Sequence, residues 1–241
     1  LLEAGGDSGY HPTSPSQPES RLMRLDDYDG VVFDLDGTIL DSECIYHAVW
    51  MDAAEALSLR SDAEFFRSLL GLSFPAAIEK AAVFFGPDFD PAEFDRVSRE
   101  AVEERLKAGV PLKPGVGDLI ETFATAGLPL AIATSSRRIS IDRHLAPHGL
   151  VSAFRTIVTQ EDVRSTKPHP EPYLTAVSRI GGVPERCLAI EDSANGVRSA
   201  VAAGLSVVAI PDIAHLPEDL IEDCFHVLGS LADLQGLIRV D

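Results

Sequence analysis

The sequence predicts an α/β fold, a doubly wound parallel sheet interrupted after its first strand by an inserted α-helical cap. Five short runs of apolar and β-branched residues alternate with stretches of helical periodicity, a pattern typical of a parallel sheet with helices on both faces. About a hundred residues between the first and second run carry helical patterns and no strand signal. The 241 residues, 45% of them hydrophobic, suffice for one such core with an insert.

The first segment, residues 1–27, is expected to be a disordered tail. Its first 24 residues are rich in Pro, Ser and Gly and lack apolar periodicity, so they cannot bury enough surface to offset the entropy cost of ordering. The chain does not begin with Met, and both a truncated start and initiation at Met23 fit the sequence.

The remaining elements follow in order along the chain. The predicted strands are residues 31–33, 130–133, 156–158, 188–190 and 207–210. The helical patterns of the insert are residues 46–57, 62–69, 75–85 and 91–107. We therefore expect a catalytic core formed by residues 28–45 and 112–241, with a helical cap over residues 46–111.

The composition excludes several classes of protein. The 20 Lys and Arg against 38 Asp and Glu give a formal charge of -18, which repels nucleic acid and anionic membranes. Cys44, Cys187 and Cys224 are far apart and lack CxxC spacing, so they indicate neither a disulfide framework nor a zinc site. No apolar run reaches the length of a membrane span, and no secretion signal is visible. We expect a soluble, cytoplasmic protein.

Polar residues follow four of the predicted strands, at the edge where ligands of open parallel sheets bind. Asp34-Leu35-Asp36 ends the first strand, Thr134-Ser135-Ser136 the second and Glu191-Asp192-Ser193 the fourth. Lys167-Pro168 lies in the loop after the third. An anionic substrate in so acidic a protein needs local positive charge from basic groups or a bound cation, and this edge offers the place for both.

Each of these residues also has a purely structural interpretation. Residues 134–136, and Asp192 or Ser193, are of the types that cap helices. Lys167 alone is typical of a solvated surface lysine. Asp34 is harder to explain in this way, because it directly follows Val-Val-Phe, and burying an unpaired carboxylate is costly.

Taken together, the four segments resemble the haloacid dehalogenase-like hydrolase superfamily, in particular its members with a helical cap after the first strand. The resemblance covers residues 28 to about 234 and implies a Rossmann-like core. Its motifs are DLDGT (34–38), ATSS (133–136), Lys167 followed by Pro168, and IEDSANGV (190–197). Four matches in this order at four strand ends make a chance similarity very improbable.

The resemblance implies hydrolysis of a small phosphomonoester, such as a sugar phosphate, through an aspartyl-phosphate. Asp34 is the predicted nucleophile, and Asp36 the acid that protonates the leaving group and later activates water. Thr134, Ser135 and Lys167 are the predicted phosphate-binding residues, with the Lys-Pro bond expected to be cis.

The resemblance also implies Mg²⁺, which screens the repulsion between the nucleophile and the phosphate. Its predicted ligands are Asp34, the Asp36 carbonyl and Asp192, with Glu191 acting through water. The predicted partner is thus a small phosphorylated metabolite, with neither nucleic acid nor membrane, and the protein is expected to be a monomer.

The cap is expected to choose the substrate, with Tyr46, His47 and Phe74 as candidate contacts. Dehalogenases of the superfamily typically lack the second acid, so Asp36 favours phosphoryl chemistry. β-Phosphoglucomutases usually carry His twelve residues after the nucleophile, where this chain has Tyr46, and basic residues around a cap glycine, where it reads Leu-Gly-Leu-Ser-Phe. A phosphatase is therefore preferred, a phosphomutase is the alternative, and a non-catalytic binding protein is disfavoured.

Overall fold

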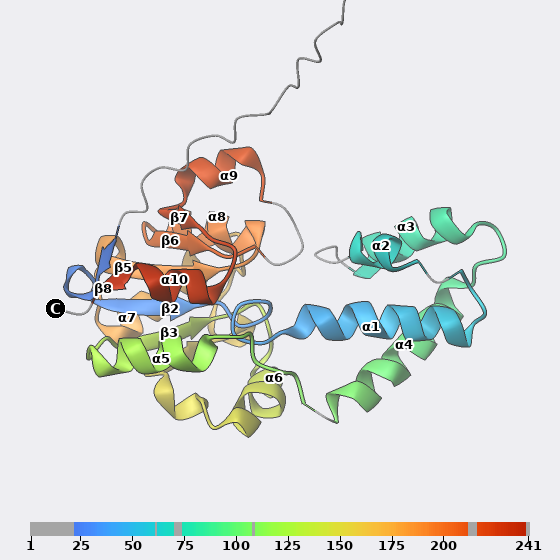
Figure 1. The fold of residues 1–241 in the computed structure, drawn as a ribbon, viewed down its shortest axis with the longest axis horizontal. Coiled ribbons are helices and arrows are strands. Elements are labelled where there is room, and N and C mark those ends of the chain that lie inside the picture. Colours follow the sequence, from blue (N-terminus) through green and yellow to red (C-terminus); the bar gives the residue numbers. More distant parts are fainter. Residues whose placement is uncertain (1–21, 61, 70–73, 108, 212–215, 240–241) are drawn as a thin grey trace, which may run out of the picture.

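A six-stranded sheet forms the centre of the computed structural model (Figure 1). The structure describes residues 22–60, 62–69, 74–107, 109–211 and 216–239. The sheet strands are β2 (Gly30–Phe33), β3 (Leu130–Ala133), β4 (Thr156–Val158), β5 (Cys187–Glu191), β6 (Ser206–Ala209) and β7 (His226–Val227). Their order is β4-β3-β2-β5-β6-β7, and all neighbours are parallel. The predicted α/β class is confirmed, and the chain order reverses beside β2, where sheets of this kind bind ligands.

Helices cover both faces of this sheet. The core helices are α5 (Val116–Thr125), α6 (Arg138–Ser140), α7 (Glu171–Ile180), α8 (Ala194–Ala202), α9 (Glu218–Asp223) and α10 (Leu231–Leu237). Val31 and Phe33 belong to one buried cluster with α5 and α10, whereas Val32 belongs to a second with α7 and α8. Successive residues of β2 therefore face opposite helical layers, which explains its uninterrupted apolar run.

Four further helices lie between β2 and α5 and form the cap, which extends away from the sheet (Figure 1). They are α1 (Ser42–Ala56), α2 (Ala63–Arg67), α3 (Phe74–Phe85) and α4 (Pro91–Leu106). Asp90 caps α4, since its Oδ1 accepts hydrogen bonds from the backbone N–H groups of Ala92 and Glu93. Contacting phenylalanine rings fill the space between α2, α3 and α4, namely Phe65, Phe66, Phe85, Phe89 and Phe94.

The two connections between core and cap run side by side. Leu40 and Leu112 form an antiparallel bridge, and the Asp41 N–H donates to the Pro111 carbonyl at 2.8 Å. The Lys113 ammonium lies 3.4 Å from Asp41 Oδ1. Because α1 begins at Ser42, the predicted boundary between residues 45 and 46 falls inside a helix, and the division into core and cap residues stays a prediction.

The predicted N-terminal tail is too long at its C-terminal end. Met23–Arg24 form β1, which pairs in parallel with β8 (Ile238–Arg239), and the side chains of Met23 and Leu25 are buried. Burial of these two apolar side chains and the pairing with β8 offset the cost of ordering this segment. Residues 1–21 lie outside the described part of the chain.

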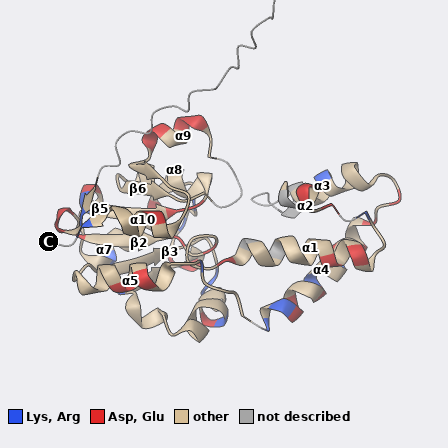
Figure 2. Cartoon of the chain, viewed as in Figure 1, with Lys and Arg blue, Asp and Glu red and all other residues tan. Residues whose placement is uncertain are grey.

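Charge is distributed unevenly over the helices. Figure 2 shows acidic residues on the outer surface of α9 and residues of both signs on α4.

Within the described ranges, no helix combines the length and the apolar composition that crossing a bilayer requires.

Candidate active site

The carboxyl ends of β2 and β5 bring the predicted acids together. Phe33 and Ile190 are partners in the parallel register, so Asp34 follows β2 beside Glu191, the last residue of β5, and Asp192. The side chains of all three acids are buried, with Glu191 wholly inaccessible. Carboxylate oxygens of the three residues lie within 4.8 Å of one another.

Lys167 supplies positive charge to this cluster. Its ammonium lies 2.5 Å from Asp34 Oδ1 and 2.5 Å from Glu191 Oε1, and its side chain is only 4% exposed. The peptide bond to Pro168 is cis, as the resemblance implies. The structure therefore places Lys167 against the acids and away from the surface, so its interpretation as a solvated lysine is wrong.

The electrostatics follow from this burial. Burial is the largest cause that raises the pKa of Asp34, and with the charges of Glu191 and Asp36 it outweighs Lys167, giving about 7. Burial would lower the pKa of Lys167, but the charges of Asp34 and Glu191 dominate and raise it. Lys167 thus stays protonated, and the pKa of Asp34 lies above that of an ordinary aspartate.

Glu191 is held by five hydrogen bonds. Its Oε1 accepts from Lys167 and from the Tyr173 hydroxyl, which lies 2.8 Å away. Its Oε2 accepts from the backbone N–H of Asp192 and from the N–H and hydroxyl of Ser193, each at 3.1 Å. Gly196 is required beside this carboxylate, because a Cβ there would stand 1.7 Å from Oε1.

The three carboxylates suit a divalent cation. Ionised, they carry three negative charges, and Lys167 compensates one of them. Oxygen ligands of this kind are those that Mg²⁺ prefers. Thr38 supports the set, since its hydroxyl donates to Asp192 Oδ1 at 3.2 Å, and Gly37, at φ +89°, lets the chain pass close to Asp192. The buried donors therefore fit a magnesium ion.

Asp36 stands apart from the buried cluster. It is exposed, and its Oδ2 accepts a hydrogen bond of 2.6 Å from the Ser136 hydroxyl. The Ser136 N–H in turn donates to the hydroxyl oxygen of buried Thr134 at 2.9 Å, while Ser135 is exposed. The sequence did not single out Ser136 as a site residue, although its place beside Thr134 and Ser135 was the signal for it.

The capping interpretations have different outcomes. Ser193 does cap α8, because its hydroxyl oxygen accepts from the Gly196 N–H at 3.1 Å. Residues 134–136 do not cap α6, whose N-cap is Arg137 and has no side-chain capping bond. The hydroxyls of Thr134 and Ser136 instead connect the end of β3 to the Asp36 loop.

Among the described residues, no contact joins a candidate residue of the cap to the acid cluster. His47 bonds within the cap, with Nε2 3.1 Å from the Ala63 carbonyl oxygen. The side chains of Tyr46 and Phe74 lie outside the described part of the structure. Substrate contacts by these three residues stay predictions.

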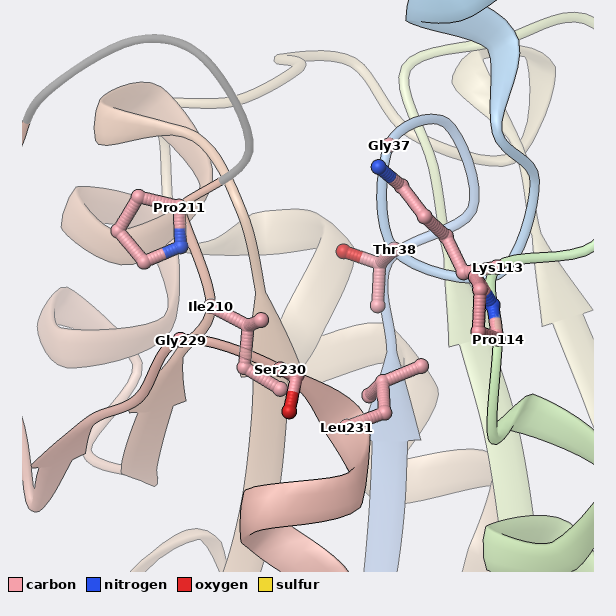
Figure 3. Close-up of a pocket in the computed structure, with 9 residues that line it drawn as sticks. All are labelled: Gly37, Thr38, Lys113, Pro114, Ile210, Pro211, Gly229, Ser230 and Leu231. Atoms are coloured by element: carbon pink, nitrogen blue, oxygen red, sulfur yellow. The ribbon is translucent and has the colours of Figure 1, made fainter.

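A cavity of about 210 Å³ lies beside the Asp36 loop (Figure 3). Gly37 and Thr38 form one wall, and the opposite wall comes from Ile210, Pro211 and the start of α10. The three buried acids are not among the described residues that line it. Thr38 belongs to both the cavity and the acid cluster, because it lines the cavity and its hydroxyl donates to Asp192.

Comparison with known proteins gives consistent matches. Residues 31–210 match the haloacid dehalogenase-like hydrolase family, a range that includes all four motifs. Fructose-1-phosphate phosphatase YqaB of Escherichia coli is 30% identical over 183 residues, covering 76% of this chain and 96% of that protein.

Two crystal structures extend the comparison. A HAD family hydrolase from Deinococcus radiodurans R1 with bound phosphate and sodium is 29% identical, with a TM-score of 0.77 over 89% of this chain and 99% of that one. CbbY from Rhodobacter sphaeroides in complex with xylulose-(1,5)-bisphosphate is 27% identical, with a TM-score of 0.62 over 88% and 100% of the chains.

These matches agree with the carboxylates, lysine and hydroxyls gathered at the sheet edge. The protein is an enzyme that hydrolyses phosphoric monoesters. The chain belongs to the haloacid dehalogenase-like hydrolase family.

Proposed function

We propose that the protein is a Mg²⁺-dependent phosphatase that hydrolyses a small phosphomonoester metabolite through an aspartyl-phosphate. The observation that carries the proposal is the position of Asp34, a buried carboxylate 2.5 Å from the Lys167 ammonium and next to Asp192. The lysine that pairs with this buried carboxylate can also bind the phosphoryl group that the carboxylate attacks, and Asp192 beside it can help to hold a cation.

In the first step, an Asp34 carboxylate oxygen attacks phosphorus, and the bond from phosphorus to the ester oxygen breaks. Protonated Asp36 gives its proton to the leaving oxygen, which departs as the alcohol. In the second step, Asp36 takes a proton from water, whose oxygen attacks phosphorus and displaces the Asp34 carboxylate. Inorganic phosphate leaves, and both aspartates return to their starting state.

The remaining groups position and stabilise the phosphoryl group. Lys167 lies where it can bind a phosphoryl oxygen next to Asp34. The Thr134 hydroxyl accepts from Ser136, so its own hydrogen is available to a phosphate oxygen, and exposed Ser135 is the second donor in this group. Bound Mg²⁺, held by Asp34, Asp192 and the Asp36 carbonyl, would neutralise charge on the phosphoryl oxygens.

A sugar phosphate is the substrate class that we propose. One relative is named for fructose-1-phosphate, and a similar structure holds a xylulose bisphosphate. The formal charge of -18 argues against nucleic acid or anionic membranes as partners. We propose a monomer that acts in the cytoplasm, where Cys44, Cys187 and Cys224 would stay reduced.

A screen of phosphorylated metabolites tests this proposal. Phosphate release is measured for sugar phosphates and other monoesters, with Mg²⁺ and again with a chelator. We expect release from at least one sugar phosphate with Mg²⁺ and none with the chelator. Turnover that depends on a sugar bisphosphate and yields no net phosphate would instead identify a phosphomutase.

The nucleophile is tested with Asp34→Asn. This variant keeps the shape of the side chain but removes its negative charge, so we expect a folded protein that releases no phosphate from any substrate. Circular dichroism and thermal denaturation serve as controls for folding. Phosphate release by the folded variant would rule out Asp34 as the nucleophile.

A further inference from the structure

Tyr173 contacts the acid cluster, but the reaction described above does not use it. It lies on α7, is wholly buried, and its hydroxyl donates to Glu191 Oε1 at 2.8 Å. The centre of its ring is 5.0 Å from the Lys167 ammonium, within the range of a cation–π interaction. Tyr173 therefore contacts both Glu191 and Lys167.

The acceptor sites of Glu191 are fully used by hydrogen bonds. A carboxylate offers about four lone-pair sites. Five donors already point at this one, two at Oε1 and three at Oε2. In contrast to Asp34 and Asp192, Glu191 is thus committed on both oxygens to groups of the protein itself.

We propose that Tyr173 is a positioning residue, and that Tyr173 and Glu191 together hold the Lys167 ammonium against Asp34. In this arrangement Glu191 anchors the lysine through the oxygen that it shares with Tyr173. The hydroxyl of Tyr173 shares Oε1 with Lys167 and so limits how strongly Glu191 draws the ammonium. The rest of the ammonium's hydrogen-bonding capacity is then directed at Asp34 and at a phosphoryl oxygen beside it.

Tyr173→Phe removes the hydroxyl and keeps the ring that packs under Lys167. Oε1 then loses one of its two donors, and Lys167 is drawn towards Glu191 and away from Asp34. Tyr28→Phe is the matched control, because it makes the same chemical change before β2, at the end of the strand opposite to the acids. Both variants are compared with wild type by thermal denaturation.

Two measurements test the position of the lysine. The first is the ¹H–¹⁵N signal of the Lys167 ammonium, assigned by its loss in Lys167→Arg. The second is steady-state phosphate release. For Tyr173→Phe we expect the ammonium signal to shift and to exchange faster with water, and kcat to fall about tenfold, with a much smaller change in KM. Tyr28→Phe should leave both unchanged.

A Mg²⁺ titration without substrate tests whether Tyr173 acts on the lysine or on the metal site. We expect Tyr173→Phe to bind Mg²⁺ as wild type does. Weaker Mg²⁺ binding with an unchanged ammonium signal would show that Tyr173 acts on the metal site and not on the lysine, and would overturn the proposal. So would a variant that loses only thermal stability, with wild-type kcat and ammonium signal.

The expected fall in kcat rests on the proposed phosphatase function, whereas the expected change in the ammonium signal does not. If wild type releases no phosphate, the proposed function fails while the ammonium signal still decides the role of Tyr173. If Tyr173→Phe does not fold, Tyr173→Met supplies a second side chain that lacks the hydroxyl, and it is judged by the same signal.

Discussion

The Lys167 ammonium lies 2.5 Å from Asp34 Oδ1, although the two residues are 133 positions apart in the sequence. Asp34 follows the central strand β2, and Lys167 precedes α7, a helix on one face of the sheet. Their contact makes the predicted nucleophile and the predicted phosphate-binding lysine one unit. The consequence is that a change at either residue shifts the pKa of the other.

Replacing Lys167 by Met should reduce the rate and shift its pH dependence. Burial and the charges of Glu191 and Asp36 raise the pKa of Asp34, whereas Lys167 lowers it, so removal of Lys167 raises that pKa further. In the proposed mechanism Asp34 attacks in its ionised form, so we expect the acidic limb of the rate profile to move to higher pH. We also expect kcat to fall by about a hundredfold or more. Phosphate release measured across a pH series checks both effects.

Lys167→Arg is the control that keeps the positive charge. It should leave the acidic limb close to that of wild type, even if the larger guanidinium lowers kcat. An acidic limb in Lys167→Met at the same pH as in wild type would show that the lysine does not control the ionisation of Asp34.

Two helical glycines give a matched test of the packing around Glu191. A Cβ at Gly196 on α8 would stand 1.7 Å from Glu191 Oε1, whereas a Cβ at Gly117 on α5 meets nothing within 4 Å. We expect Gly196→Ala to lower the free energy of unfolding by about 1–3 kcal/mol and to reduce kcat, because Glu191 must move. Gly117→Ala should stabilise the protein by about 0.5–1 kcal/mol and leave kcat unchanged. Urea unfolding and phosphate release decide between these outcomes, and equal effects of both substitutions would contradict the prediction.

The sequence predicts the fold more completely than it predicts the details of the site. The central strands are short apolar runs because both of their faces are buried, and they stand out from the helical segments around them. The pairing of β1 with β8 involves two residues on each strand, too few to produce a periodic pattern. Motif spacing placed the acids and Lys167 at one edge, because parallel strands end together there.

Side-chain partners depend on tertiary structure, so the sequence could not provide them. Tyr173 lies at a buried position of the amphipathic helix α7, where its pattern predicts ordinary core packing. Its hydroxyl finds Glu191 only because α7 packs beside β5. In the same way, Ser136 reaches Asp36 only because β3 is the neighbour of β2.

The ionised carboxyl of Asp162 should stabilise the folded protein at neutral pH, and this stabilisation should be lost in acid. Burial would raise the pKa of its carboxyl, but hydrogen bonds from the Thr159 N–H and hydroxyl, together with Arg179, lower it from 3.8 to about 2. A carboxyl with a depressed pKa in the folded state stabilises the protein above its unfolded pKa, and this contribution disappears as the pH falls through about 2. Because Asp162 is partly exposed and screened by solvent, the contribution at neutral pH is about 1 kcal/mol.

Asp162→Asn measures this contribution. The difference in unfolding free energy between wild type and variant should be largest above the ordinary carboxyl pKa of 3.8 and should shrink as the pH approaches about 2. Urea unfolding at a series of acidic pH values gives this difference directly. A difference that stays constant over the series would mean that Asp162 does not change its ionisation on folding in the expected direction.

Thr38 should control the affinity for Mg²⁺ without touching the ion. Its hydroxyl donates to Asp192 Oδ1 at 3.2 Å, which fixes the orientation of a predicted ligand. Thr38→Val keeps the size of the side chain and removes this donor, so we expect Mg²⁺ binding to weaken about tenfold. Calorimetric titration with Mg²⁺ in the absence of substrate measures the affinity.

Thr122→Val on α5 is the control for this change. The Thr122 hydroxyl donates to the Asp118 carbonyl within the same helix, and it is not part of the acid cluster, so Mg²⁺ affinity should not change. Thr38 also lines the cavity of about 210 Å³ (Figure 3), and in Thr38→Val a methyl group takes the place of the hydroxyl that donates to Asp192. If Thr38→Val and Thr122→Val bind Mg²⁺ equally well, Thr38 does not orient Asp192 for the metal, and the bond between them serves only to pack the Asp36 loop against the end of β5.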